Sequence, residues 1–91
     1  MRVRLHGILR KVVGVKEIIL DYEELTLDKL FHYLTEHYKG LAHYIFKNGE
    51  KLSIRGIIIL INGRHAMFQG GLKAVIKRGD VVDLIPPVHG G

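Results

Sequence analysis

The sequence has 91 residues, enough for one domain but too few for two domains that each bury an adequate core. It contains no cysteine, which excludes disulfide bonds, thiolate zinc sites and cysteine nucleophiles. Its formal charge of +5 favours acidic partners, but the basic residues are scattered without interleaved aromatic residues, so nucleic acid is not the partner we expect. No apolar stretch approaches the roughly 20 residues of a membrane span, and the N-terminal residues lack the apolar core of a signal peptide. We therefore expect a cytoplasmic protein without membrane association.

The first part of the chain is predicted to form a β-hairpin. Val3 and Leu5 alternate with polar residues, the period of two that marks a half-buried strand, and we expect this strand to run from Arg2 to about Leu9. Gly14 offers a turn position, and the apolar run from Lys16 to Leu20 supplies the second strand.

A single amphipathic helix is predicted over residues 26–39. Thr26 is placed to cap its first turn, and Leu25 before the cap can pack on Leu30 as a hydrophobic staple. Gly40 supplies the left-handed residue that commonly closes a helix. The helical spacing rests on apolar side chains that fall on one face, namely Leu27, Leu30, Phe31, Leu34 and Tyr38.

The middle of the chain contains the strongest strand signal. Residues 41–46 are compatible with a short helix, and residues 47–50 with a turn. The uninterrupted β-branched run over 57–61 predicts a central strand covered on both faces. Asn62-Gly63 follows it and predicts a tight type I′ hairpin, because that turn needs positive φ at both central residues. A return strand is expected over 64–68.

The remaining elements complete a small sheet. Gly70-Gly71 opens a loop, residues 72–76 are expected to pack back on the core, and residues 81–85 form the last strand after a turn at 78–80. Pro86-Pro87 must end that strand, since neither nitrogen can donate to a neighbouring strand. This order of elements predicts an α+β fold of the β-grasp type, a mixed sheet of four to five strands with one main helix packed across it.

We expect a domain over 1–85 followed by a projecting tail over 86–91. The diproline holds the tail off the sheet, and two terminal glycines end it without side chains, a shape that suits insertion into a narrow channel of another protein. A terminal diglycine also arises by chance or as a frayed end, so its position after a strand and a diproline is what makes it informative. The tail residues expected to bind a partner are Pro86, Pro87, Val88, His89 and Gly90.

Three segments, Asn62-Gly63-Arg64, residues 78–84 and residues 86–91, resemble the MoaD/ThiS family of ubiquitin-like sulfur carriers. The chain length and the Pro-Pro-Val-x-Gly-Gly ending are most similar to the MoaD branch, the small subunits of molybdopterin synthase. The resemblance implies that a separate enzyme, related to ubiquitin-activating enzymes, uses ATP to adenylate the carboxylate of Gly91, which then becomes a thiocarboxylate. The sulfur would pass, within the large subunit of molybdopterin synthase, to the pterin precursor of the molybdenum or tungsten cofactor. The chain itself would bind no cofactor and would serve as a non-catalytic carrier.

Other outcomes of the same chemistry stay open. The activated tail could serve tRNA thiolation, thiazole synthesis or attachment to protein lysines, or the chain could be an interaction module whose tail is never activated. If the partner is the large synthase subunit, Phe68 and Val88 are its expected apolar contacts. Leu60 and Ile61 are assigned to the core instead.

The remaining candidate residues receive structural interpretations. His32 and His37 are five positions apart, which does not place them on one helix face, so we expect no metal site. Asp80 is a natural turn former after a glycine, and Asp83 is expected to face outward on the last strand as a surface residue.

Overall fold

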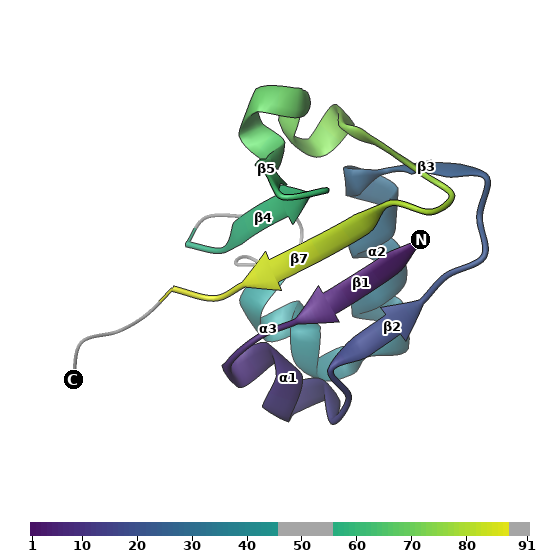
Figure 1. Cartoon of the computed structure of the whole chain (residues 1–91). Coiled ribbons are helices and arrows are strands. Elements are labelled where there is room, and N and C mark those ends of the chain that lie inside the picture. Colours follow the sequence, from purple (N-terminus) through teal and green to yellow (C-terminus); the bar gives the residue numbers. More distant parts are fainter. Residues whose placement is uncertain (46–55, 88–91) are drawn as a thin grey trace.

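The computed structural model describes residues 1–45 and 56–87, which form a mixed sheet with a helix packed across one face (Figure 1). The sheet has five strands in the order β2-β1-β7-β4-β5. Its central strand is β7 (Val81–Ile85), which pairs in parallel with β1 (Arg2–Leu5) and antiparallel with β4 (Ile58–Ile61). This is the predicted β-grasp architecture, in which the first and last strands of the domain lie side by side.

The N-terminal strands pair as predicted, but a helix separates them. β2 (Glu17–Ile19) is antiparallel to β1, which confirms the hairpin pairing. The first strand ends at Leu5 rather than near Leu9, because Gly7, with a φ of +57°, turns the chain into α1 (Ile8–Val13). The side chain of Leu9 is fully buried, so packing rather than helix length stabilises this short element.

The main helix, α2 (Leu27–His37), begins where the sequence predicted. The backbone N–H of Lys29 donates a hydrogen bond to the Thr26 hydroxyl at 3.4 Å, which is the predicted cap. The helix ends at His37 rather than at residue 39, and the N–H of Tyr38 donates to the carbonyl oxygen of Leu34 at 2.8 Å. Its buried apolar face consists of Leu27, Leu30, Phe31 and Leu34.

Gly40 does not close α2 as predicted; it lies within a short 3-10 helix, η1 (Lys39–Leu41). An added Cβ at this glycine would lie 2.2 Å from Cγ1 of Val12, so the missing side chain lets η1 pack against α1. η1 leads into α3 (Ala42–Ile45), which confirms the short helix in this region. The predicted turn at 47–50 lies outside the described residues.

A second, two-stranded sheet has no counterpart among the sequence predictions. β3 (Glu24–Thr26) pairs antiparallel with β6 (Val75–Lys77). Ala74 and Ile76 are buried, which confirms that this segment packs back on the core. The pairing holds the residues before α2 against β6, the strand that precedes β7 in the sequence.

The tight hairpin after β4 is confirmed, but its return strand is short. Asn62 and Gly63 have φ values of +52° and +80°, as a type I′ turn requires. β5 (Arg64–His65) does not extend over the predicted 64–68, because a 3-10 helix, η2 (Ala66–Gln69), begins directly after it. Nδ1 of His65 accepts a hydrogen bond from the backbone N–H of Met67 at 3.2 Å, which stabilises the change from strand to 3-10 helix.

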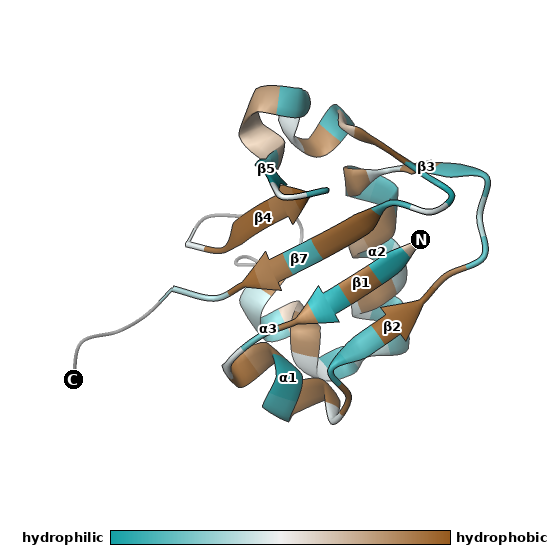
Figure 2. Ribbon diagram, viewed as in Figure 1, coloured by the Kyte–Doolittle hydropathy of each residue, from teal (hydrophilic) through white to brown (hydrophobic). Residues whose placement is uncertain are grey.

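β4 is covered on one face only, so the prediction of burial on both faces was wrong. Ile59 and Ile61 are buried on the face that carries α2, whereas Ile58 on the other face is 44% exposed. In the described part of the chain no helix covers that second face. Figure 2 shows the contrast between the alternating residues of β1 and the largely hydrophobic β4 and β7.

Candidate functional site

The C-terminal tail leaves the domain from the middle of the sheet. β7 is held on both sides by neighbouring strands, and the carbonyl oxygen of Leu84 also accepts a hydrogen bond from the N–H of His6 at 3.2 Å. Pro86 and Pro87 then continue the chain away from the sheet (Figure 1). The remaining tail residues, Val88, His89, Gly90 and Gly91, lie outside the described part of the chain, so their roles stay predictions, as does the domain boundary at residue 85.

Two glycines from distant parts of the chain flank the diproline. Gly7, between β1 and α1, lies so close to Pro86 that an added Cβ would be 3.0 Å from the proline Cγ. Gly56, before β4, has a φ of +85°, and its added Cβ would be 3.7 Å from Cγ of Pro87. The sequence did not reveal these approaches, although Gly7 interrupts the alternating pattern of the first strand. Because neither glycine has a side chain, no bulky group lies beside the diproline at these two points. We call Pro86 and Pro87 the root of the tail.

Asp83 is buried beneath two basic side chains, so its assignment as a surface residue was wrong. Its carboxylate accepts hydrogen bonds from Nε and Nη2 of Arg4 at 2.8 and 3.0 Å, and Nε2 of His6 lies 2.8 Å from Oδ1. The hydrogen bonds from Arg4 lower the pKa of Asp83 despite its burial, and His6 acts in the same direction. The same pair raises the pKa of Arg4. The network joins β1 to β7 a few residues before the tail begins.

Asp80 forms the predicted turn, and it also binds the hairpin after β4. Its carboxylate accepts hydrogen bonds from the N–H of Lys77 at 2.8 Å and from the amide of Asn62 at 3.0 Å. Burial opposes ionisation of Asp80, but these two hydrogen bonds, together with the positive charges of Lys77 and the N-terminus, lower its pKa. The amide oxygen of Asn62 in turn accepts from the N–H of Val81 at 2.9 Å. These contacts fix the end of the sheet opposite the tail root.

An apolar patch lies on the sheet face that α2 does not cover. Leu60 pairs with His65 and with Asp83, and opposite residues of antiparallel strands point to the same face. The ring of Phe68 contacts that of His65 edge to face, with centroids 6.0 Å apart, and Phe68 is 85% exposed. We call Ile58, Leu60, His65, Phe68 and Ile85 the open-face patch.

The open-face patch includes Leu60, which we had assigned to the core, and Phe68, which we had predicted to bind a partner. Ile61 is buried in the core as predicted, but Leu60 is only half-buried and belongs to the open-face patch. Phe68 lies in η2 rather than at the end of a strand, and its exposure leaves it accessible to a partner. Its contribution to binding stays a prediction.

Residues 1–45 and 56–87 contain neither a metal site of clustered side chains nor a membrane-spanning helix. Within these ranges no three His, Cys, Asp or Glu side chains come close enough to share a metal ion. The ring nitrogens of His32 and His37 instead lie 2.9 Å from backbone carbonyl oxygens one turn earlier in α2. No helix in the same ranges is long and apolar enough to cross a membrane.

The fold and the tail root define a β-grasp domain in which Pro86 and Pro87 continue the chain directly from the central strand, the arrangement of ubiquitin-like proteins. Residues 3–91 match the ThiS family. Small archaeal modifier protein 3 of Haloferax volcanii is 30% identical over 92 residues, covering 100% of this chain and 98% of that protein. The chain therefore belongs to the ThiS family of ubiquitin-like sulfur carriers, as the sequence resemblance implied.

Solved structures agree over nearly the whole chain. The solution structure of small archaeal modifier protein 1 from Methanosarcina acetivorans is 32% identical, with a TM-score of 0.84 that covers 99% of this chain and 94% of that one. A chain in the crystal structure of the Amycolatopsis orientalis BexX/CysO complex is 30% identical, with a TM-score of 0.79 and coverage of 99% and 98%. These similarities confirm the predicted fold class.

Proposed function

We propose that this protein is a sulfur carrier whose Gly91 carboxylate is adenylated, converted to a thiocarboxylate and used as the sulfur donor in molybdopterin synthesis. The observation that carries the proposal is the Pro-Pro-Val-His-Gly-Gly ending directly after the central strand. The pairing of β7 with strands on both sides holds the start of this tail, while the diproline directs it away from the sheet.

The chemistry requires an activating partner. A carboxylate resists attack by a sulfur nucleophile because an oxide would have to leave, so the oxygen must first attack the α-phosphorus of ATP and displace pyrophosphate. A sulfide-level donor then attacks the acyl-adenylate carbon and expels AMP, which leaves sulfur in place of one carboxylate oxygen. The sequence has no G-x-x-x-x-G-K-[ST] loop that could bind the phosphates of ATP. ATP is therefore assigned to a separate adenylating enzyme, and we place the carrier in the cytoplasm as part of the proposal.

The proposed complex with the large synthase subunit uses the open-face patch together with the tail. Phe68 and Ile58 expose apolar surface that binding would remove from water. An aromatic anchor beside an inserted tail would concentrate the binding energy in a small area, as is common at protein interfaces. The patch would position the carrier while the terminal residues reach the acceptor.

A second function, covalent modification of proteins, has a specific observation in its favour. The modifier relative from Haloferax volcanii aligns with the full length of this chain. Modification would use the same acyl-adenylate: the amine of a protein lysine would attack its carbonyl carbon, expel AMP, lose a proton and form an amide bond instead of a thiocarboxylate. The two functions diverge only after activation, so the acceptor must be tested directly.

The experiment measures the intact mass of the protein after incubation with ATP, a sulfide source and the adenylating enzyme of the same cell. We expect the mass increase of one oxygen replaced by sulfur, and the same species in protein purified from the native cell under conditions that preserve thiocarboxylates. A chain that lacks Gly91 is the matched control. Binding of the enzyme without adenylate formation or a mass increase would favour the interaction module.

The sulfurated protein is then offered to the large synthase subunit with the pterin precursor. Separately, the unmodified chain is incubated with cell extract, ATP and the adenylating enzyme. Transfer of sulfur to the pterin supports the molybdopterin assignment. Amide-linked conjugates on protein lysines without pterin sulfuration would assign the protein to the modifier function instead.

A further inference from the structure

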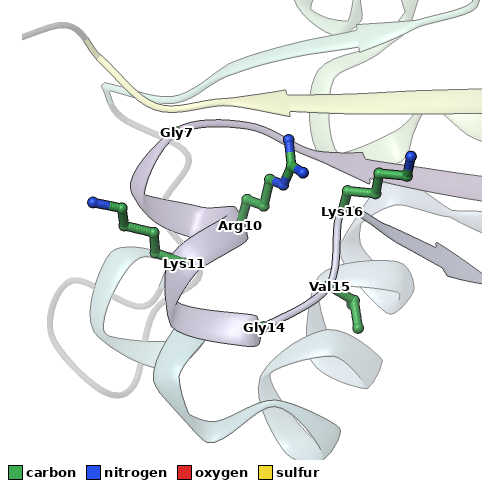
Figure 3. A pocket seen from close by; sticks show the side chains of 6 residues that line it. All are labelled: Gly7, Arg10, Lys11, Gly14, Val15 and Lys16. Atoms are coloured by element: carbon green, nitrogen blue, oxygen red, sulfur yellow. The ribbon is translucent and has the colours of Figure 1, made fainter.

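Two adjoining hollows lie at the corner of the domain formed by α1 and the start of β2. The larger, of about 570 Å³, is lined by Gly7, Arg10, Lys11, Gly14, Val15 and Lys16. Figure 3 shows Arg10 and Lys16 on opposite sides of it, with Lys11 on the outer side of α1. The smaller, of about 270 Å³, is lined by Arg4, Leu5, His6, Arg10, Lys16 and Glu17. We call Arg10, Lys11 and Lys16 the basic corner.

The charges of the basic corner are not neutralised within the described structure. Residues 8–16 contain these three cations and no acidic residue. Neighbouring cations do have acidic partners, since Arg2 binds Glu17 at 3.1 Å and Arg4 binds Asp83. Within residues 1–45 and 56–87 the side chains of the basic corner have no hydrogen bond or ion pair. Three exposed positive charges around one hollow create a local potential that an anionic group would relieve.

The basic corner adjoins the root of the tail. Gly7 lines the larger hollow and also contacts Pro86, with the added-Cβ distance of 3.0 Å to the proline Cγ. In Figure 1, α1 follows β1 at the same end of the sheet as the arrowhead of β7, from which the tail leaves. A protein that draws the tail into its active site therefore has this corner within its contact area.

Aliphatic side chains around the basic corner indicate a protein partner rather than nucleic acid. Ile8, Val12 and Val15 are 43%, 37% and 45% exposed and lie within the same short segment as the cations. Protein interfaces combine apolar contacts with a charged rim, whereas surfaces for single-stranded nucleic acid use aromatic side chains on which bases stack. Residues 8–16 contain no aromatic residue.

We propose that the basic corner binds aspartate or glutamate side chains of the adenylating enzyme and steers the tail toward its active site; this inference rests on the proposed function. Charge pairs at the rim of an interface act mainly on the association rate, and salt screens them. The basic corner would therefore determine the carrier concentration at which the enzyme is half-saturated. The maximal rate of the chemistry at Gly91 would stay unchanged once the complex has formed.

The test compares two triple charge reversals that alter the net charge equally. One carries Arg10→Glu, Lys11→Glu and Lys16→Glu, and the control carries Lys29→Glu, Lys73→Glu and Lys77→Glu, all exposed and remote from the tail root. ATP–pyrophosphate exchange by the adenylating enzyme is measured against carrier concentration at low and high salt. Reversal of the basic corner should raise the half-saturating concentration by about tenfold or more at low salt, with an unchanged maximal rate. The control should change it by less than about threefold, and salt should reduce the difference between the two.

Equal effects of the two triples would overturn the proposal, because net charge alone would then explain them. A corner variant that keeps its half-saturating concentration but loses affinity for transfer RNA would assign the surface to nucleic acid and also overturn it. Circular dichroism checks folding, and the corresponding glutamine triple at the basic corner, with a smaller expected effect, replaces the reversal if that variant does not fold. Absence of exchange with the unmodified chain would instead refute the proposed function, and with it this inference.

Discussion

Replacing Gly7 with alanine tests whether the domain packs against the root of its tail. Gly7 has φ and ψ of +57° and −133°, a region that residues with a Cβ rarely occupy, and backbone strain of this kind costs about 1–3 kcal/mol. The new methyl would also lie 3.0 Å from Cγ of Pro86, whereas unstrained carbon contacts lie at about 3.5–4.0 Å. Overpacking of the exposed Gly7 position against the partly buried Pro86 adds about 1 kcal/mol. We therefore expect Gly7→Ala to lower the free energy of unfolding by about 3 kcal/mol in all.

The assay is a double-mutant cycle measured by urea denaturation. Because a chain of this length has about 5–13 kcal/mol of stability, all variants should remain folded in water. Pro86→Ala removes the ring that the new methyl meets, so Gly7→Ala should cost only about 2 kcal/mol in that background, a coupling of about 1 kcal/mol. Gly79→Ala, with a φ of +92° and nothing within 4 Å of its added Cβ, controls for strain without contact. An equal cost of Gly7→Ala in both backgrounds would refute the packing of Pro86 on this glycine.

Three further predictions concern the tail, the open-face patch and the buried carboxylate. Deletion of Gly91 should leave the melting temperature unchanged and abolish ATP–pyrophosphate exchange, because the tail follows the last strand; a large fall in melting temperature would show that the tail is packed into the domain. Phe68→Ala should weaken binding to the large synthase subunit by more than about 1 kcal/mol in a calorimetric titration, with an unchanged circular dichroism spectrum, and unchanged affinity would remove Phe68 from the interface. Asp83 has a lowered pKa in the folded protein, so its stabilisation is complete above the unfolded carboxyl value of about 3.9 and is lost as the pH falls through the folded value. Asp83→Asn should reduce the free energy of unfolding at neutral pH and make its decrease below about pH 4 less steep. Urea unfolding across a pH series measures both effects, and an unaltered pH profile would contradict the role of the ion pair with Arg4.

The elements that the sequence predicted well are those with strong local signals. Thr26 and the apolar stripe behind it defined the start and the buried face of α2. Asn62-Gly63 needed only its own backbone preferences to form a hairpin, and the diproline needed only its missing donors to end β7. In each case the signal lies within a few residues, so no knowledge of distant partners was required.

The elements that the sequence missed depend on distant partners. α1 has only six residues, too few to show helical periodicity, and is held by the burial of Leu9. The alternation of β7 correctly turned Asp83 away from the core, but its burial depends on Arg4 of a parallel strand at the other end of the chain. In the sequence, the cations of the basic corner look like scattered charges. The packing of α1 near the tail root brings them around one hollow.

The central place of β7 has a consequence for synthesis. Residues 81–85 are made after the other strands of the described sheet, yet they join β1 on one side and β4 on the other, so this sheet cannot close until β7 has been synthesised. A product that stops before β7 would have its pairs β2-β1 and β4-β5 separated, with two unpaired strand edges that favour aggregation. The tail follows immediately after the strand that completes the fold. An activating enzyme that requires both the folded surface and the terminal glycine would therefore act only on molecules in which β7 has been synthesised and paired.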